Sequence, residues 1–406
     1  MQTIEYFQKH KDLLNQVIDI GTPVFVTDKS ILQQKVQNVK NAFDNNCLLY
    51  YAVKANFNPH IIEVLKKEGI DGIETVSPYE IQLAQKMDFK NTKILFTGNN
   101  VDTHELDVAK EAGVIVNIGS MSELQYFANQ YKGSKIAIRV NPGFGDGEFE
   151  QVVTGGKDAK FGILHTHIKE ALKIIRDNDV KLIGIHCHLG SGFYNTDNFA
   201  PMVEYMFSLA SQINGIEFID LGGGLGVRYK PSTKEINLNQ FADVVKKQYE
   251  KHSVLKSNGI KIILEPGKYL VAESTFLLAK VTNVREQQGI KIIALDTGFN
   301  HIIRPALYSS CHHMINISKL YEEKEEVKVV GNICESTDVL SEKIQISKPE
   351  IGDIIAILTT GAYCSAMSSL YNLRPYASEV LIDGNKFAII RKSLNFDETI
   401  NSLGFV

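Results

Sequence analysis

The stretch from Leu48 to Lys67, LLYYAVKANFNPHIIEVLKK, contains the unit from which much of the chain is built. Its first part, Leu48–Val53, is a short apolar run, which is typical of a buried strand. Its last part, Pro59–Lys67, has apolar residues spaced along one face of a helix. Lys54 stands where the strand is expected to end. The stretch therefore predicts a buried strand, a loop that carries a lysine, and an amphipathic helix.

The same alternation of strand and helix recurs between residues 48 and 265. The helical pattern Tyr79–Met87, for example, follows the second predicted strand. Strands that alternate with helices eight times predict a parallel (β/α)8 (TIM) barrel. The eight predicted strands are Leu48–Val53, Gly72–Val76, Ile94–Thr97, Val114–Ile118, Lys135–Asn141, Leu182–His188, Glu217–Leu221 and Lys261–Glu265.

Polar residues and glycines gather where these strands end. Catalytic residues of such barrels collect at the carboxyl ends of the strands, and a phosphate site commonly follows strands seven and eight. The sequence therefore predicts an active site at this end of the barrel. The residues expected there are Lys54, Glu74, Arg139, His188, Gly222, Gly223, Gly224 and Glu265.

After Gly267 the pattern changes to short β-rich runs, and Asp383-Gly384-Asn385 between the last two is typical of a hairpin turn. The early segment Pro23–Val26 is expected to add a strand to this region. We predict a barrel domain over residues 28–267 and a mostly β domain, a sandwich or a barrel, formed by residues 1–27 and 268–406. The predicted runs are Phe276–Val281, Lys291–Leu295, Val327–Val330, Asp353–Leu358, Ala377–Ile382 and Lys386–Arg391.

The composition is that of a globular protein, with 406 residues, 44% apolar residues and a formal net charge of -4. The length favours two domains, and the slightly acidic balance argues against a nucleic-acid or anionic-membrane partner. No apolar run is long enough to span a bilayer, and the N-terminus lacks the apolar core of a secretory signal. Five widely spaced cysteines without a CxxC pair are typical of reduced thiols, so we expect a cytoplasmic location.

The sequence His186-Cys187-His188 has the residue types of a metal site. Alternate residues of a strand point to opposite faces of the sheet, so Cys187 cannot join both histidines around one ion. We therefore expect no metal at this position.

Five features match what a protein must supply to pyridoxal 5′-phosphate (PLP). Lys54 could form the imine, and bare N–H groups of Gly222-Gly223-Gly224 could approach the phosphate. Glu265 could face the pyridine nitrogen, and His188 could stack on the ring. Cys334 could protonate the carbanion left after bond cleavage. Each feature also has an ordinary structural alternative: a surface lysine, a tight turn, a surface carboxylate, a buried histidine or a small buried thiol.

A series of short motifs runs in one order from about residue 23 to residue 395. They are YAVKAN (51–56), NPGFG (141–145), HCHLGSG (186–192), GGGL (222–225), EPG (265–267), DTGFN (296–300), IRPALY (303–308), CESTD (334–338), GAY (361–363), MSSLYN (367–372) and RP (374–375). Through this set the chain resembles the alanine-racemase-like, fold type III, PLP-dependent decarboxylases, and within them the diaminopimelate decarboxylase family. Several motifs are weak singly, but the ordered set is highly specific.

The resemblance implies a role for each matching position. Lys54 would hold PLP, His188 would stack on its ring, and Glu265 would pair with its nitrogen. Cys334 would protonate the substrate carbon, and in this family it reaches the neighbouring subunit's site together with Glu335, so a homodimer is implied. Further cofactor contacts would come from Glu74, Arg139, Ser191, Gly222, Gly223, Gly224, Gly267, Lys268 and Tyr363. Substrate contacts would come from Lys268, Arg304, Tyr308, Glu335 and Tyr363.

The resemblance also implies a reaction, the decarboxylation of meso-2,6-diaminopimelate at its D-configured centre to L-lysine and CO2. The end of this substrate that is kept is a zwitterion. Arg304, Tyr308 and Glu335 would read it with a cation, a hydroxyl donor and an anion. Lysine and ornithine lack the distal carboxylate, so they would leave Arg304 unpaired and bind poorly.

One departure from the family leaves the substrate open. The family usually has arginine after Glu-Pro-Gly, where this chain has Lys268, and lysine lacks the bidentate fork of arginine. The alternatives are a sister decarboxylase that acts on a siderophore intermediate, ornithine, lysine or arginine, an amino-acid racemase, and a PLP-binding protein without catalysis. The β domain with Cys334 and Glu335 argues against the last of these.

Overall fold

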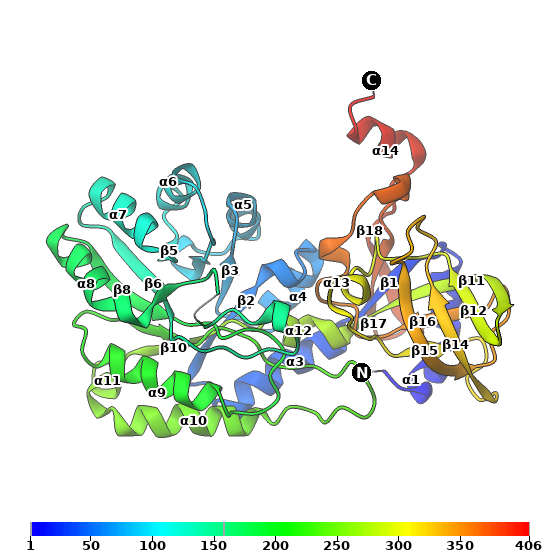
Figure 1. Cartoon of the computed structure of the whole chain (residues 1–406), viewed down its shortest axis with the longest axis horizontal. Helices are drawn as coiled ribbons and strands as arrows, with labels where there is room; N and C mark the ends of the chain where they lie inside the picture. The colour runs from blue at the N-terminus through cyan, green and yellow to red at the C-terminus, as the bar shows by residue number, and fades with distance from the viewer. Residues whose placement is uncertain (1, 157–158, 406) are drawn as a thin grey trace. The chain divides into compact units, whose positions relative to one another are not determined.

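The computed structural model describes residues 2–156 and 159–405, and the chain divides into two compact units (Figure 1). One unit, the barrel unit, comprises residues 35–226 and 235–269. The other, the β unit, comprises the residues up to 34, residues 227–234, and those from 270 onward. Residues 227–234 lie inside the predicted barrel domain, but they cluster with the β unit. Within the described residues, no helix combines the length and the apolar character needed to cross a membrane.

The barrel unit contains a closed ring of eight parallel strands, which confirms the predicted barrel. Each strand pairs with the next along the chain, and β10 closes the ring on β2. All eight predicted strands are present, with ends that differ from the prediction by at most two residues. They are β2 (Cys47–Ala52), β3 (Gly72–Thr75), β4 (Ile94–Phe96), β5 (Ile115–Ile118), β6 (Lys135–Asn141), β8 (Lys181–His186), β9 (Phe218–Asp220) and β10 (Lys261–Leu264).

Helices lie outside these strands, and Figure 1 shows α5 to α8 along one side of the barrel and α9 and α10 along another. The predicted helix Pro59–Lys67 is α4, with the same limits, and Asn58 caps it by accepting from the backbone of His60. The remaining helices are α3 (Lys29–Ala42), α5 (Pro78–Lys86), α6 (Thr103–Glu111), α7 (Met121–Gln130), α8 (Ile168–Asp177), α9 (Phe199–Ala210), α10 (Leu238–Lys251), α11 (Ser253–Ser257) and α12 (Lys268–Val271).

The predicted end of the sixth strand is wrong by two residues, because β8 ends at His186 and not at His188. Beyond Cys187 the backbone bonds to a loop and no longer to the barrel. Leu189 O accepts from Thr154 N and from Gly155 N, at 2.9 and 3.1 Å. His188 therefore lies in the segment that leaves the strand. A two-residue strand, β7 (Ile163–Leu164), pairs with β6 outside the ring and was not predicted.

The β unit is built mainly from one sheet with the order β15-β14-β12-β11-β1-β17-β18, and β16 joins β11 to β13. Every predicted run has a matching strand, and the early segment Pro23–Val26 is part of β1. The predicted hairpin is confirmed, since Asp383 pairs with Lys386 across a two-residue turn. The strands are β1 (Val24–Asp28), β11 (Thr275–Gln287), β12 (Ile290–Leu295), β13 (Met314–Asn316), β14 (Lys324–Val330), β15 (Val339–Ser347), β16 (Ile354–Ile357), β17 (Ser378–Asp383) and β18 (Lys386–Arg391).

Some elements of this unit were not predicted. β13 has only three residues, and β15 combines buried, intermediate and exposed residues without regular alternation, so neither has a strong apolar pattern. Helices α1 (Ile4–Lys9) and α2 (Lys11–Ile18) begin the unit, and their buried residues pack against β1 and β11. The unit also contains α13 (Arg304–Tyr308) and α14 (Phe396–Ser402).

Candidate active site

Lys54 lies immediately after β2, in the short helical turn Val53–Ala55. Its Nζ lies 2.7 Å from Glu74 Oε2 on the neighbouring strand β3. The lysine side chain is 40% exposed, whereas the glutamate is 1% exposed. Burial raises the pKa of Glu74 to about 7, although Lys54 acts to lower it. An accessible amine is thus held at the carboxyl end of the barrel beside a carboxyl group that titrates near neutral pH.

Gly222, Gly223 and Gly224 follow β9 in a loop that has no room for side chains. A Cβ on Gly223 would lie 2.4 Å from Glu265 O, and one on Gly224 would lie 2.1 Å from the ring of Phe193. Gly222 and Gly224 also have positive φ angles of 67° and 93°, which residues with a side chain rarely adopt. The loop therefore requires glycine, and it lets a ligand approach the backbone closely, as an anion site does.

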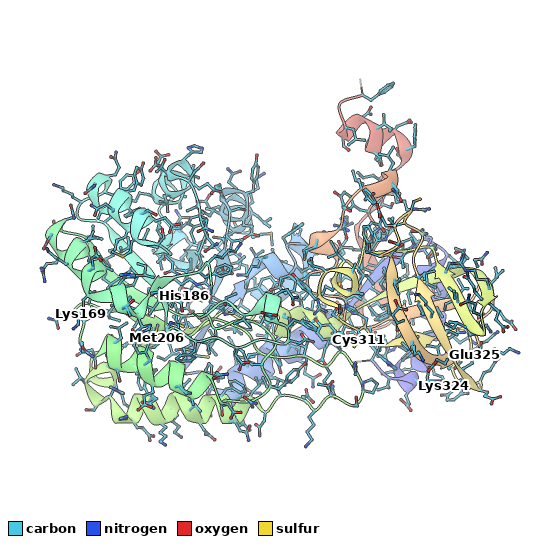
Figure 2. The ribbon with its side chains drawn as sticks, in the orientation of Figure 1. Lys169, His186, Met206, Cys311, Lys324 and Glu325 are labelled. Atoms are coloured by element: carbon cyan, nitrogen blue, oxygen red, sulfur yellow. The ribbon has the colours of Figure 1, made fainter. Side chains whose placement is uncertain are left out.

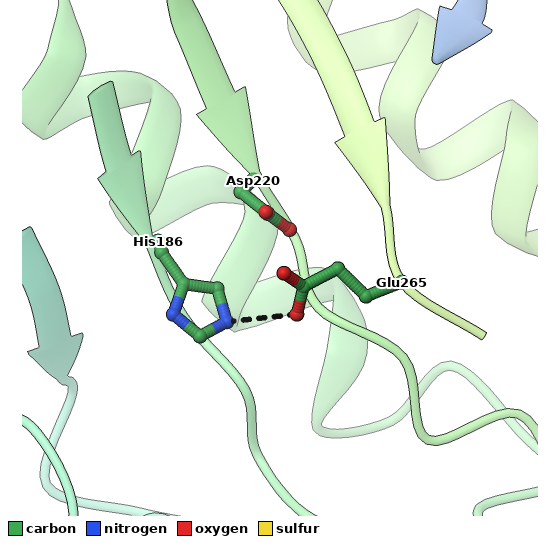
Figure 3. Close-up of side chains that lie close together, drawn as sticks. All are labelled: His186, Asp220 and Glu265. Carbon is green, nitrogen blue, oxygen red and sulfur yellow. Dashed lines mark ion pairs between the residues drawn. The ribbon is translucent and has the colours of Figure 1, made fainter. Parts of the chain in front are cut away.

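Three buried side chains from successive strands meet below this loop (Figure 3). His186 ends β8, Asp220 ends β9, and Glu265 follows β10. A ring nitrogen of His186 and one carboxylate oxygen each of Asp220 and Glu265 lie within 4.8 Å of one another. His186 Nε2 lies 3.3 Å from Glu265 Oε2. In Figure 2, His186 lies among the strands of the barrel unit, whereas Lys169 on α8 lies at its outer edge. The three strands therefore bring two carboxyl groups and an imidazole into one buried group.

The charges in this group differ from those of the same residues in water. Burial by itself would raise the pKa of Glu265, but the neighbouring His186, Lys54 and Asp220 outweigh it and lower the pKa to about 2. Burial and the charge of Glu265 raise the pKa of Asp220 well above its ordinary value. Burial lowers the pKa of His186. These shifts favour the charged form of Glu265 over that of Asp220, and the neutral form of His186.

His188 and Arg139 lie near the same strand ends. Gly223 N donates to His188 Nδ1 at 3.2 Å, so the ring proton of the neutral histidine is on Nε2. Burial, followed by the charge of Arg139, lowers the pKa of His188 well below its usual value. Arg139 on β6 is 7% exposed, and its guanidinium carbon lies 4.6 Å from the ring centroid of Phe161. A neutral flat ring and a fixed cation are thus available beside the glycine loop.

Lys268, which follows the Glu-Pro-Gly motif, is 6% exposed. Its Nζ lies 3.2 Å from Glu148 Oε2, in the long loop after β6. The backbone N–H of Glu148 also donates to Ser191 O at 2.8 Å. Lys268 and the half-buried Ser191 are therefore joined through one loop residue, and this lysine is ion-paired within the barrel unit.

The predicted substrate residues Arg304 and Tyr308 lie on α13 of the β unit. Arg304 is 2% exposed, and its guanidinium carbon lies 4.2 Å from the ring centroid of Tyr229. Its Nη1 lies 3.3 Å from His312 Nε2, while His312 Nδ1 donates to Leu358 O at 2.8 Å. Burial lowers the pKa of His312 to about 3, so this neutral ring accepts from Arg304. A buried guanidinium is thus held in place by an aromatic face and a neutral acceptor.

Cys334 and Glu335 lie in an exposed turn of the β unit. Cys334 N donates to Asn372 Oδ1 at 2.7 Å, and the hydroxyl of Tyr371 donates to Glu335 Oε1 at 2.5 Å. Asp338 holds the end of the turn by accepting from Ile333 N at 2.8 Å. Both candidate side chains are therefore presented to solvent on an ordered turn.

Tyr363 follows Gly361-Ala362 and has a positive φ of 57°, which is unusual for a residue with a side chain. Its side chain is half-buried in the β unit. Gly361 before it is required by space, because a Cβ there would lie 1.9 Å from Val271 O.

The structure thus groups Lys54, Glu74, Arg139, His188 and Glu265 with the glycine loop, Ser191, Gly267 and Lys268 in the barrel unit. Arg304, Tyr308, Cys334, Glu335 and Tyr363 belong to the β unit.

Sequence reasoning missed Asp220, Asn117 and His312, and it considered His186 only as a metal ligand. Asp220 directly precedes the glycine loop, and period-two spacing places it on the same side of the chain as Gly222, so a signal was present. Asn117 and His312 have no such signal, because their roles depend on partners distant in sequence.

The barrel group fits PLP on three observations. The glycine loop has no side chains between its backbone and a ligand, Glu265 is a buried acceptor, and Lys54 is an accessible amine. Together they match the phosphate, the ring nitrogen and the aldehyde carbon of that cofactor.

Comparison with known proteins agrees with this reading. Residues 29–272 match the family described as "Pyridoxal-dependent decarboxylase, pyridoxal binding domain". The chain is 35% identical to diaminopimelate decarboxylase of Methanothermobacter thermautotrophicus, over 96% of this chain and 93% of that protein. It is 34% identical to the Aquifex aeolicus enzyme of the same name, over 93% and 90%. Its structure is similar to diaminopimelate decarboxylase from Helicobacter pylori complexed with L-lysine, with a TM-score of 0.86 and 29% identity over 95% of this chain and 98% of that one.

Proposed function

Because this chain belongs to the pyridoxal-dependent decarboxylases, and within them to the diaminopimelate decarboxylases, we propose that it converts meso-2,6-diaminopimelate to L-lysine and CO2. The observation that carries the proposal is the group of Lys54, Glu265 and the glycine loop at one end of the barrel. The family, the PLP cofactor and the reaction predicted from the sequence are confirmed by the matches. The roles of single residues remain predictions.

When bound, PLP supplies an electron sink for the electron pair that the departing carboxyl group leaves behind. Lys54 would hold it covalently through Nζ. Glu74, 2.7 Å from that amine and with a pKa near 7, can take up the proton that the amine releases. Glu265 would face the ring nitrogen, and its negative charge would keep that nitrogen protonated.

The rest of the barrel site would position the cofactor. The N–H of Gly224 in the glycine loop would bind the phosphate, with Ser191 and Tyr363 as further contacts, while Gly222 N and Gly223 N hold Asp220 and His188. The neutral ring of His188, fixed through Nδ1 by Gly223 N, would lie against the ring face. Arg139 would place its buried cation near the lysine and the ring oxygen. Gly267 would keep the backbone close, since a Cβ there would lie 3.0 Å from Ala52 O.

We propose Cys334 as the acid that completes the reaction. The bond between Cα and the carboxyl carbon breaks, CO2 leaves, and the thiol proton of Cys334 forms the new Cα–H bond. The exposed position of Cys334 and Glu335 supports their service to the site of a second copy of the chain, so the functional unit would be a homodimer.

Arg304, Tyr308 and Glu335 are proposed to read the end of the substrate that is kept. The planar guanidinium of Arg304 suits a carboxylate, because it can donate two parallel hydrogen bonds. Tyr308 would add a hydroxyl donor, and Glu335 would accept from the ammonium group. Lysine and ornithine lack this distal carboxylate, so they would leave a buried guanidinium without its ligand.

We also propose a cytoplasmic location. None of the five cysteines forms a disulfide in the part of the chain that the structure describes. Unpaired cysteines are typical of proteins in a reducing compartment.

One observation favours a second candidate, a sister decarboxylase with a different substrate. Lys268 replaces the usual arginine, and its amine is paired with Glu148 at 3.2 Å. A lysine held by a glutamate offers less charge to a substrate carboxylate than a free arginine would.

The test is an amino-acid panel on the purified protein reconstituted with PLP, in which CO2 and the product are both measured. We expect CO2 and lysine from meso-diaminopimelate. We expect no CO2 from lysine or from ornithine. Lys54→Ala should abolish the visible absorbance of lysine-bound PLP, whereas Lys67→Ala, on the exposed face of α4, should keep it. Turnover of another amino acid in preference to diaminopimelate would select the sister decarboxylase.

A further inference from the structure

The two buried carboxyl groups beside the glycine loop each have one oxygen held by the protein. Asp220 Oδ1 accepts from Gly222 N at 2.8 Å, and Glu265 Oε2 lies 3.3 Å from His186 Nε2. The same Gly222 accepts from Glu265 N through its carbonyl oxygen, also at 2.8 Å. Gly222 thus links the ends of the two strands and sets how the two side chains face each other.

The other oxygen of each carboxyl group, Asp220 Oδ2 and Glu265 Oε1, is buried and has no hydrogen-bond partner among the described residues. His186 Nε2 is also buried without a well-aligned hydrogen-bond partner, and Glu265 Oε2 is the acceptor that lies 3.3 Å from it. Figure 3 shows the two carboxyl groups turned toward each other. Ionisation of both buried carboxyl groups at such close range is unfavourable, because burial weakens the screening of their repulsion. A single proton between these two oxygens would satisfy both of them. Asp220 is the group that carries it, because Glu265 has the additional donor His186.

His186 has its own orientation fixed from the opposite side. The amide of Asn117 on β5 lies 2.7 Å from His186 Nδ1, and the amide N–H is the donor in that contact. The ring proton must then be on Nε2, which faces Glu265. Asn117, His186 and Asp220 are 3%, 1% and 0% exposed, so water does not compete for these positions.

We propose that His186 and a protonated Asp220 are positioning residues that each donate a hydrogen bond to Glu265 and hold it as the single anion that faces the ring nitrogen of PLP. A carboxylate has about four acceptor sites, so two donors leave room for the pyridinium N–H. The inference rests on the proposed placement of Glu265 against that nitrogen. It assigns to Asp220 the role of a donor, although aspartate is an acceptor at most sites.

The test compares Asp220→Asn with Asp220→Leu in the PLP-loaded protein. Asparagine can keep both contacts, with its oxygen accepting from Gly222 N and its amide donating to Glu265, whereas leucine removes the donor at similar volume. We expect Asp220→Asn to keep PLP affinity within about threefold, and Asp220→Leu to lose roughly ten- to hundredfold, as for one hydrogen bond to a charged group. Asp71→Asn, a carboxylate at the other end of the same barrel that accepts from Leu49 N, is the matched control.

Two spectroscopic readouts are independent of turnover. With 15N-labelled PLP, the ring nitrogen should be protonated in the wild type and in Asp220→Asn, and less so in His186→Phe. The infrared spectrum of the wild type should contain a protonated carboxylic acid band that is absent from Asp220→Asn. If the protein does not turn over diaminopimelate but shows these signals, the proposed substrate fails and this inference stands.

Three results would overturn the inference. Loss of PLP affinity in Asp220→Asn equal to that in Asp220→Leu would mean that Asp220 acts as an anion. An unprotonated ring nitrogen in the wild type would remove Glu265 from that position. A stoichiometric divalent metal ion in the wild type that Asp220→Asn lacks would make the three side chains metal ligands instead.

Discussion

Substitution of Gly223 by alanine tests the glycine loop most directly. The new Cβ would lie 2.4 Å from Glu265 O and 3.1 Å from Glu265 C, and ordinary contact begins at 3.4 Å. The two backbone segments must therefore separate by about 1 Å, since 3.4 − 2.4 = 1.0. Both colliding atoms belong to the backbone, so no side chain can rotate away. Such overpacking costs on the order of 1–3 kcal/mol in the free energy of unfolding.

The same displacement should affect the cofactor more than the fold. It would move the adjoining Gly224 N–H away from the phosphate, and the loss of one hydrogen bond to a charged acceptor weakens binding roughly ten- to hundredfold. It would also shift Glu265, and a misplacement of about 1 Å at a catalytic site costs roughly 100-fold in rate. We therefore expect weaker PLP binding and slower turnover, with a melting temperature only a few degrees lower.

The assay is a PLP titration of the apoprotein followed by absorbance, with turnover and thermal unfolding measured on the same samples. Gly119→Ala is the control, because a Cβ there would meet nothing closer than 3.4 Å and its φ is not positive. It should leave PLP affinity and turnover close to those of the wild type. If Gly223→Ala binds PLP as tightly as Gly119→Ala does, the loop is not the phosphate cradle and the reasoning is refuted.

Three further predictions concern other parts of the chain. Cys334→Ala should slow turnover roughly 100- to 10,000-fold, as for a lost general acid, while the absorbance of bound PLP persists. The control Cys311→Ala should change neither turnover nor absorbance. Normal turnover of Cys334→Ala would remove this thiol from the mechanism. Arg304→Lys should raise KM for diaminopimelate about tenfold or more with little change in kcat, because the charge remains but the bidentate fork of arginine is lost. An unchanged KM would mean that the distal carboxylate binds elsewhere. Burial lowers the pKa of His301 to about 4, and its ring nitrogens contact Thr297 Oγ1, Pro375 O and the amide of Asn300, all in the β unit. Because the unfolded chain binds a proton near pH 6.5 and the folded chain does not, this histidine favours folding above that pH, and about 2 kcal/mol is lost between pH 7 and pH 5. Urea unfolding at both pH values should show a smaller loss for His301→Gln, and an equal loss would contradict the sign.

The sequence alone determined the barrel and the place of its active site, because regular alternation of strand and helix requires parallel strands whose carboxyl ends meet at one end. Lys54, Glu74, Gly222–Gly224 and Glu265 could be assigned to this end from their positions in the repeat. The elements that were not predicted are short or half-exposed, such as β13, or lie at the N-terminus, such as α1 and α2. Their formation depends on the sheet against which they pack and not on a strong pattern of their own.

Only the tertiary structure decided which side chains are partners. Lys268 pairs with Glu148, which lies 120 positions away, and His186 meets Asn117 at a separation of 69. The proton proposed for Asp220 depends on its approach to Glu265, which is set by how β9 and β10 align in the closed ring. Local sequence encodes periodicity and the face of each strand, but the hydrogen-bond partners of a buried polar group depend on register and closure, which are properties of the whole barrel.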